Sequence, residues 1–185
     1  YLHAIKLVPY LGHPYNQLGI LFETSRTNQL STIFYYVRSV ACRYNFPLAS
    51  TNMENFFKKL VDIPLTRYNP SLNNPNSINN LLNNNEPHLN LVVKLSHKDL
   101  INLYLQINAI IYYMSKSINA LPNSTGTNSQ RISSYIELFK TSFKAFVSTP
   151  LQREKLDSTQ LSQMITILIF LVTQTEVSSF YLSII

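Results

Sequence analysis

The chain has 185 residues, which suits one domain of ordinary size or one domain and part of another, and its 45% hydrophobic residues exclude wholesale disorder. Its three glycines are too few for a sheet protein with many tight turns or for glycine-rich phosphate loops, so we expect an all-α fold. The net charge of +6 permits attraction to phosphate or to acidic peptides, whereas the single cysteine, Cys42, can form neither an internal disulfide nor a thiolate metal site and indicates a reducing compartment.

Helical spacing of apolar residues dominates the chain. Steps of three and four, typical of amphipathic helices, relate two sets: Leu30, Ile33, Phe34, Val37, Val40 and Ala41, and Leu100, Leu103, Tyr104, Ile107, Ile111, Met114 and Ile118. Capping boxes at Ser96 with Asp99 and at Asp157 with Gln160 mark two helix starts. Together these signals predict helices near residues 2–8, 15–25, 28–44, 48–61, 97–120, 130–147 and 158–175.

The first third of the chain carries a pattern of small and aromatic residues. Its members are Tyr15, Leu18, Gly19, Phe22, Ser31 and Tyr35, followed by Pro47. This order resembles the tetratricopeptide (TPR) pattern, in which paired helices stack side by side. Gly19 and Ser31 would then let two antiparallel helices approach, while Phe22 and Tyr35 fill the seam between them. An ordinary helical hairpin, which also needs small and aromatic residues at its crossing, is the alternative.

Three stretches depart from the amphipathic pattern. Residues 68–90 contain ten Asn and three Pro, which compete for backbone hydrogen bonds or remove donors, so we interpret them as a mobile surface insertion whose shortening is tolerated. Residues 122–129 (PNSTGTNS) are typical of a connector. Residues 164–172 (MITILIFLV) are apolar on every side, but at about 1.5 Å per residue they fall short of the roughly 30 Å hydrocarbon layer, which favours a buried central helix over a membrane span.

Residues suited to catalysis are spread thinly along the chain. The four His and nine acidic residues show no metal-ligand spacing such as H-x-x-x-H or H-x-x-E-H. Nothing in the sequence resembles a nucleophile elbow, a P-loop or a dinucleotide fingerprint. We therefore expect no enzyme active site, no cofactor and no metal site.

Two long segments carry a family resemblance. LVPYLGHPYNQLGIL at 7–21 and LSTIFYYVRSVACRYNFPLASTNMENFFKKL at 30–60 closely resemble the SMG and Est family of nonsense-mediated mRNA decay adaptors and telomerase-associated proteins. Within them, IFYYVRS and FPLASTN are most similar to its SMG-seven type. SKSIN at 115–119 and LQREKLDSTQLSQMITILIF at 151–170 match in order only, and the Asn-rich insertion and the connector are departures from the family pattern.

The resemblance implies a two-part helical body. TPR-like hairpins forming the C-terminal part of a TPR/14-3-3-like domain are expected at 1–62, an Asn-rich linker or loop at 63–95, and a truncated bundle of helical hairpins at 96–185. Because the chain begins with Tyr1 rather than Met, we interpret it as a portion of a longer protein.

The same resemblance implies a non-catalytic adaptor of nonsense-mediated mRNA decay. Such an adaptor recognises a phosphorylated RNA helicase of mRNA decay through its 14-3-3-like layer and docks a paralogous adaptor as a heterodimer. Its phosphate ligands are expected upstream of Tyr1, so Lys6, Arg38 and Arg43 would only border that surface. The expected localisation is cytoplasmic, with shuttling to the nucleus left open.

A nucleic-acid-binding module, as in the telomerase-associated branch, is the competing hypothesis. Phosphates of RNA or single-stranded DNA would then contact Arg38, Arg43, Lys58 and Lys59. The bases would stack on Tyr35, Tyr36 and Tyr44. Because the apolar residues of 30–41 assign one face of the same helix to the core, we rank the scaffold first. A structural solenoid whose surface docks a paralogue is compatible with that ranking.

Overall fold

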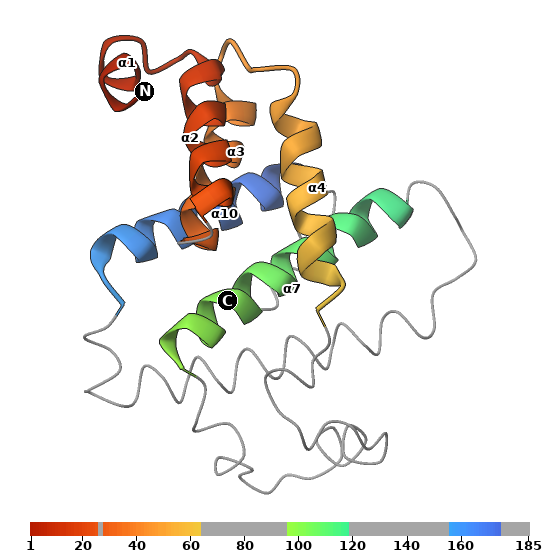
Figure 1. The fold of residues 1–185 in the computed structure, drawn as a ribbon. Helices are drawn as coiled ribbons and strands as arrows, with labels where there is room; N and C mark the ends of the chain where they lie inside the picture. Colours follow the sequence, from red (N-terminus) through yellow and green to blue (C-terminus); the bar gives the residue numbers. More distant parts are fainter. Residues whose placement is uncertain (26–27, 64–95, 119–155, 175–185) are drawn as a thin grey trace, which may run out of the picture. The chain divides into compact units, whose positions relative to one another are not determined.

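The computed structural model describes residues 1–25, 28–63, 96–118 and 156–174, and these parts are helical (Figure 1). The helices are α1 (Leu2–Leu7), α2 (Gly12–Ser25), α3 (Gln29–Ala41), α4 (Ala49–Val61), α7 (His97–Ile118) and α10 (Ser158–Gln174). The described residues contain no strand, only an isolated bridge between Leu11 and Tyr44. The all-α expectation is therefore confirmed, while the expected helix at 130–147, the Asn-rich insertion and the connector lie outside the described residues.

The described helices divide into two compact units. Helices α1 to α4 and α10 belong to the first unit, and α7 belongs to the second. The division expected from the sequence, at residues 62 and 95, stays a prediction.

Helices α2 and α3 form an antiparallel hairpin whose ends are fixed by specific hydrogen bonds. At the start of α3, the Asn28 side chain accepts a hydrogen bond of 3.0 Å from the Ser31 backbone N–H, which satisfies one of the unpaired donors of the first turn. At its other end, the Ser39 hydroxyl donates to the Gly12 carbonyl at 2.8 Å. Helix α3 ends at Ala41, earlier than the predicted residue 44, because Tyr44 leaves the helix to pair with the backbone of Tyr10 and Gly12.

The closest approach within the hairpin is between Gly19 of α2 and Tyr36 of α3. A Cβ at Gly19 would lie 2.5 Å from two carbons of the Tyr36 ring, and Tyr36 itself is only 1% exposed. The small residue therefore lies where the sequence placed it, but the aromatic partner was predicted wrongly. Phe22 and Tyr35 stack on each other at 5.5 Å between centroids and remain half-buried, whereas Tyr36 fills the seam.

The buried face of α3 is wider than its apolar spacing predicted, because α3 contacts both α2 and α10. Phe34 and Val40 are partly exposed, whereas the polar residues Ser31, Thr32 and Ser39 are buried. Ser31 accepts a hydrogen bond of 3.3 Å from Gln163 of α10. A second neighbouring helix thus converts the polar side of α3 into interior surface.

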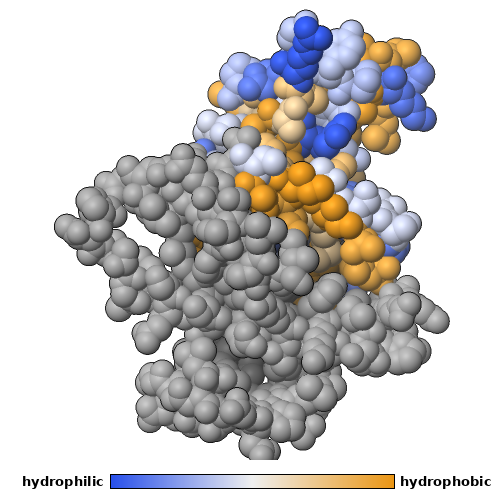
Figure 2. Space-filling view, turned by 180° about the vertical axis from the view of Figure 1, so that it is seen from behind, coloured by the Kyte–Doolittle hydropathy of each residue, from blue (hydrophilic) through white to orange (hydrophobic). Residues whose placement is uncertain are grey.

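The burial of α10 and α7 is the reverse of the prediction, because α10 has an exposed face and α7 is buried on every side over part of its length. Helix α10 was predicted to be buried on every side, but it leaves Leu161, Ile165 and Ile169 exposed, one turn apart along one face. Figure 2 shows hydrophobic side chains at the surface of the described residues. None of the described helices is long and apolar enough to cross a membrane.

Helix α7, predicted to be amphipathic, is buried on every side from Leu100 to Ala109. Two of its buried amides donate hydrogen bonds: Asn108 donates to the Tyr104 carbonyl at 2.8 Å, and Gln106 donates to the Ile63 carbonyl. The polar positions of α7 therefore do not form a face toward solvent. Gln106 and Asn108 instead donate hydrogen bonds to carbonyl groups inside the second unit.

Candidate functional site

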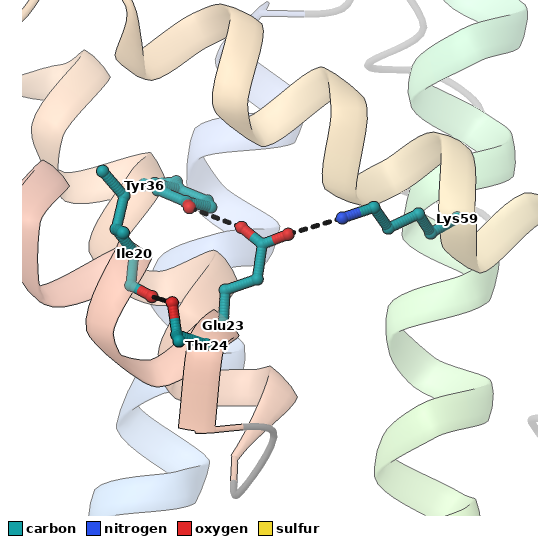
Figure 3. A network of polar contacts seen from close by, with 5 residues as sticks. All are labelled: Ile20, Glu23, Thr24, Tyr36 and Lys59. Carbon is teal, nitrogen blue, oxygen red and sulfur yellow. Dashed lines mark hydrogen bonds and ion pairs between the residues drawn. The ribbon is translucent and has the colours of Figure 1, made fainter.

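Lys59 and Tyr36, two of the predicted binding residues, are engaged by Glu23 of α2 (Figure 3). The Lys59 ammonium lies 2.7 Å from Glu23 Oε1, and the Tyr36 hydroxyl donates to Glu23 Oε2 at 2.6 Å. The pKa of Tyr36 is raised well above its ordinary value, mainly because the side chain is buried. The hydrogen bond to Glu23 and the negative charge of the Glu23 carboxylate raise it further. This network ties α2, α3 and α4 together, so Tyr36 is not available to stack on a base.

Arg38 lies on the outer side of the hairpin, against Tyr15. Its guanidinium carbon is 5.2 Å from the centroid of the Tyr15 ring, and Nη2 donates to the Tyr15 hydroxyl at 3.3 Å. The Tyr15 hydroxyl in turn donates to the Pro9 carbonyl at 3.2 Å. Tyr15 is buried while Arg38 remains exposed, so the cation is held in position without being removed from water.

The segments that precede α2 and follow α3 lie side by side and carry exposed aromatic residues. Leu11 and Tyr44 form a parallel bridge, in which Gly12 N–H donates to the Tyr44 carbonyl at 2.8 Å and Tyr44 N–H donates to the Tyr10 carbonyl at 3.1 Å. The rings of Tyr10 and Tyr44 meet edge to face at 5.9 Å, and the Arg43 guanidinium lies 5.7 Å over the Tyr44 ring. We call Tyr10, Arg43 and Tyr44 the loop cluster.

Gly12 lets these two segments come together. A Cβ at Gly12 would lie 2.7 Å from the Phe46 nitrogen and 2.7 Å from the Ser39 carbonyl oxygen, both of them backbone atoms that cannot rotate away. Beside it, the rings of His13 and Phe46 pack edge to face at 5.1 Å. A side chain at Gly12 would therefore separate the two segments that form the loop cluster.

The predicted basic residues do not converge on one surface. Helix α4 runs alongside α2 in the same direction, because Asn52 pairs with Asn16 and Lys59 pairs with Glu23 further along both helices. Lys58 and Lys59 occupy the last turn of α4, about 15 Å along the helix from its start at Ala49. Arg38 and Arg43 belong instead to the opposite end of the hairpin, where α3 ends. Lys6 lies exposed in the last turn of α1.

The TPR-like residues occupy different environments. Tyr15, Leu18 and Ser31 are buried, with Gly19 at the close approach, whereas Phe22 and Tyr35 line the edge of the hairpin. Tyr10, Gly12 and Phe46 were not among the predicted site residues. A usable signal was the rarity of glycine in this chain, since Gly12 is one of three.

The described residues offer no group of three or more His, Cys, Asp or Glu that could hold a metal ion. Burial raises the pKa of the Cys42 thiol despite the opposing charge of Arg38. The thiol is therefore protonated near neutral pH, which does not favour nucleophilic chemistry at this residue. The arrangement is suited to holding helices and presenting a surface.

Comparison with known proteins adds family information to this geometry. The family model described as the Est1 DNA/RNA binding domain matches residues 1–180. The nonsense-mediated mRNA decay factor SMG7 of Danio rerio is 50% identical over 62 residues, which is 34% of this chain and 5% of the relative. From Arabidopsis thaliana, a factor named SMG7-like is 40% identical over 65 residues (35% of this chain, 7% of the relative). The SMG7 of the same plant is 41% identical over 59 residues (32% of this chain, 6% of the relative). The chain thus matches between 5% and 7% of the length of these relatives.

Proposed function

The chain belongs to the SMG and Est family, whose Est1 DNA/RNA binding domain spans almost all of it, and we propose that it is a non-catalytic scaffold segment of a nonsense-mediated mRNA decay factor. The observation that carries this proposal is the interlocking of α2, α3 and α4. Gly19 packs against Tyr36, and Glu23 joins Tyr36 to Lys59. Such cross-helix contacts support a rigid body that presents surfaces to partners.

We infer two protein partners for the parent protein. One is a phosphorylated RNA helicase of mRNA decay, recognised through a 14-3-3-like layer, and the other is a paralogous adaptor that forms a heterodimer with it. A role in mRNA decay accords with a cytoplasmic location, and shuttling to the nucleus stays an open alternative. Names of the SMG7 relatives support the decay role, and the helical hairpin supports the TPR-like end of a 14-3-3-like layer.

The cations of this chain are poorly arranged for phosphate recognition by themselves. A charge-assisted Arg–phosphate pair is strong when the cationic groups converge in a fixed geometry. Lys59 is paired with Glu23 at one end of the hairpin. Arg38, on the Tyr15 ring, and Arg43, over the Tyr44 ring, lie at the opposite end. We therefore propose that the phosphoserine ligands are supplied by residues outside 1–185.

Fluorescence anisotropy with a labelled peptide of the decay helicase, in phosphorylated and unphosphorylated forms, tests this role. The full-length parent is expected to bind the phosphorylated peptide selectively, while the 185-residue chain binds both forms weakly and with strong salt dependence. Equal binding of the two forms by the parent would contradict the adaptor role. Submicromolar binding of the phosphopeptide by the chain alone would place the phosphate ligands within it.

A second function, binding of single-stranded nucleic acid in decay or at telomeres, is favoured by the match to the Est1 DNA/RNA binding domain family. A salt series with labelled single-stranded RNA distinguishes it from the scaffold role. Submicromolar RNA binding by the chain at physiological salt would reverse our ranking if it were lost on charge reversal of Arg38, Arg43, Lys58 and Lys59.

A further inference from the structure

The loop cluster exposes two neighbouring aromatic rings. Tyr10 is 52% and Tyr44 is 56% exposed, whereas Tyr15 and Tyr36 of the same hairpin are buried. A tyrosine ring exposes apolar area that water solvates poorly, so an exposed pair is a favourable surface for a flat ligand. Two exposed tyrosine rings thus lie together where the segments around α2 and α3 meet.

The cluster is fixed by the backbone rather than by the packing of its own side chains. The bridge between Leu11 and Tyr44 and the two hydrogen bonds beside it set the positions of the main chain. Gly12 allows this pairing because any Cβ there would collide with the Phe46 and Ser39 backbones. A ligand would therefore meet rings whose backbone positions need little further ordering, which reduces the entropic cost of binding.

The charge around the cluster favours an anion. Residues 1–53 contain a single acidic residue, Glu23, against Lys6, Arg26, Arg38 and Arg43. Glu23 lies eleven residues along α2 from Gly12, a rise of about 16 Å, where it is neutralised by Lys59. The exposed Arg43 lies over Tyr44 and keeps its guanidinium at the surface.

We propose that Tyr10, Arg43 and Tyr44 form a docking point for single-stranded nucleic acid, with an unstacked base against the tyrosine rings and its phosphate on Arg43. Aromatic rings beside a cation suit this ligand because every base has a flat face and every nucleotide carries a negative charge. The site rests on the second function proposed above, binding of single-stranded nucleic acid, to which it assigns residues, and it does not depend on the scaffold role. A proline-rich peptide, which also binds aromatic surfaces, would gain little from Arg43.

Fluorescence anisotropy with the 185-residue chain and a short fluorescein-labelled single-stranded RNA tests the site. Replacing a stacking residue by alanine removes about 1–3 kcal/mol per base, so Tyr44→Ala and Tyr10→Ala should each weaken binding by roughly 5- to 150-fold. Arg43→Ala should weaken binding and reduce the slope of log K against log salt by about one. Tyr44→Trp retains a flat ring and should preserve the affinity.

Matched controls separate the site from general effects. Leu21→Ala removes an apolar side chain that is as exposed as Tyr44, and Lys98→Ala removes an exposed cation of α7. Both should leave RNA affinity within about twofold of the wild type if binding is local. Because the bridge uses the Tyr44 backbone, Tyr44→Ala should retain the wild-type circular dichroism spectrum.

Four competing ligands complete the test. Unlabelled single-stranded RNA or single-stranded DNA should displace the probe, and a difference between them would report a contact to the 2′-hydroxyl group. Duplex RNA should compete weakly because its bases are stacked internally. The proposal would be overturned by unchanged affinity in Tyr44→Ala, by equal competition from the duplex, or by displacement with a proline-rich peptide at concentrations where single-stranded RNA fails. None of these outcomes affects phosphopeptide binding by the parent protein, which is measured separately.

Discussion

Replacing Gly19 with alanine is the sharpest perturbation of the hairpin. The added Cβ would lie 2.5 Å from the Cδ1 and Cε1 atoms of Tyr36. Carbon atoms normally rest about 3.5–4.0 Å apart, so the ring and the new methyl group must separate by about 1 Å. Tyr36 cannot easily provide this displacement, because its ring is buried and its hydroxyl is bonded to Glu23.

Two effects of opposite sign determine the size of the change. Alanine is favoured over glycine in a helix interior by about 1 kcal/mol. Overpacking of a well-packed interior typically costs 1–3 kcal/mol, and here the obstacle is an anchored ring rather than the end of a flexible side chain. We expect Gly19→Ala to lower the free energy of unfolding by about 1–2 kcal/mol, and Gly19→Leu to lower it by about 3 kcal/mol or more.

Urea denaturation followed by circular dichroism measures these changes, and substitutions at Tyr36 supply the controls. Tyr36→Phe keeps the ring, so Gly19→Ala should still destabilise that variant. Tyr36→Ala removes the ring, so in that background Gly19→Ala should become neutral or stabilising by up to about 1 kcal/mol. An unchanged urea midpoint for Gly19→Ala in the wild type, or the same effect in both Tyr36 backgrounds, would refute the close approach.

Two further predictions concern polar groups in the same unit. The raised pKa of Tyr36 means that the folded state favours the neutral phenol. The stability that this group contributes is therefore complete below the ordinary phenol pKa of 10.0 and is lost as pH rises above it. Urea titrations across alkaline pH should show a smaller loss of the free energy of unfolding for Tyr36→Phe than for the wild type. Asn52→Ala removes the 3.0 Å hydrogen bond to the buried Asn16 amide and should lower the free energy of unfolding by about 1–3 kcal/mol in the same assay. As a control, substitution of the exposed Asn55 by alanine should change it by less than about 0.5 kcal/mol. Equal effects of the two substitutions would contradict the pairing of Asn52 with Asn16.

Local sequence signals predicted the helices well because they act over a few residues. Apolar spacing and capping residues placed the described helices within a few residues of their observed bounds. At the start of α7, the Asp99 N–H donates to the Ser96 hydroxyl, and this hydroxyl donates to the Asp99 carboxylate, so Ser96 caps the helix as predicted. Gly19 was correctly placed at a close approach, since a glycine within a helical pattern needs a packing reason.

The partners of these helices could not be read from the same signals. Tyr35 and Tyr36 are adjacent in the sequence and chemically identical, so only the rotation of α3 against α2 and α10 decided which ring fills the seam. The same limit applied to the basic residues: Lys58 and Lys59 are neighbours, yet the position of Glu23 on another helix determines that Lys59 is paired.

Tertiary structure also decided which helix is interior and which segments meet. By composition alone α10 is the most apolar of the described helices. Nevertheless, α7 is the helix that is buried on every side, from Leu100 to Ala109, and this stretch includes the polar residues Gln106 and Asn108. The bridge between Leu11 and Tyr44 joins segments more than thirty residues apart. The sequence by itself determined helix type, length and ends, which depend on short-range hydrogen bonding and side-chain spacing. Burial and the loop cluster were decided only by the tertiary structure, because both depend on neighbours that are distant along the chain.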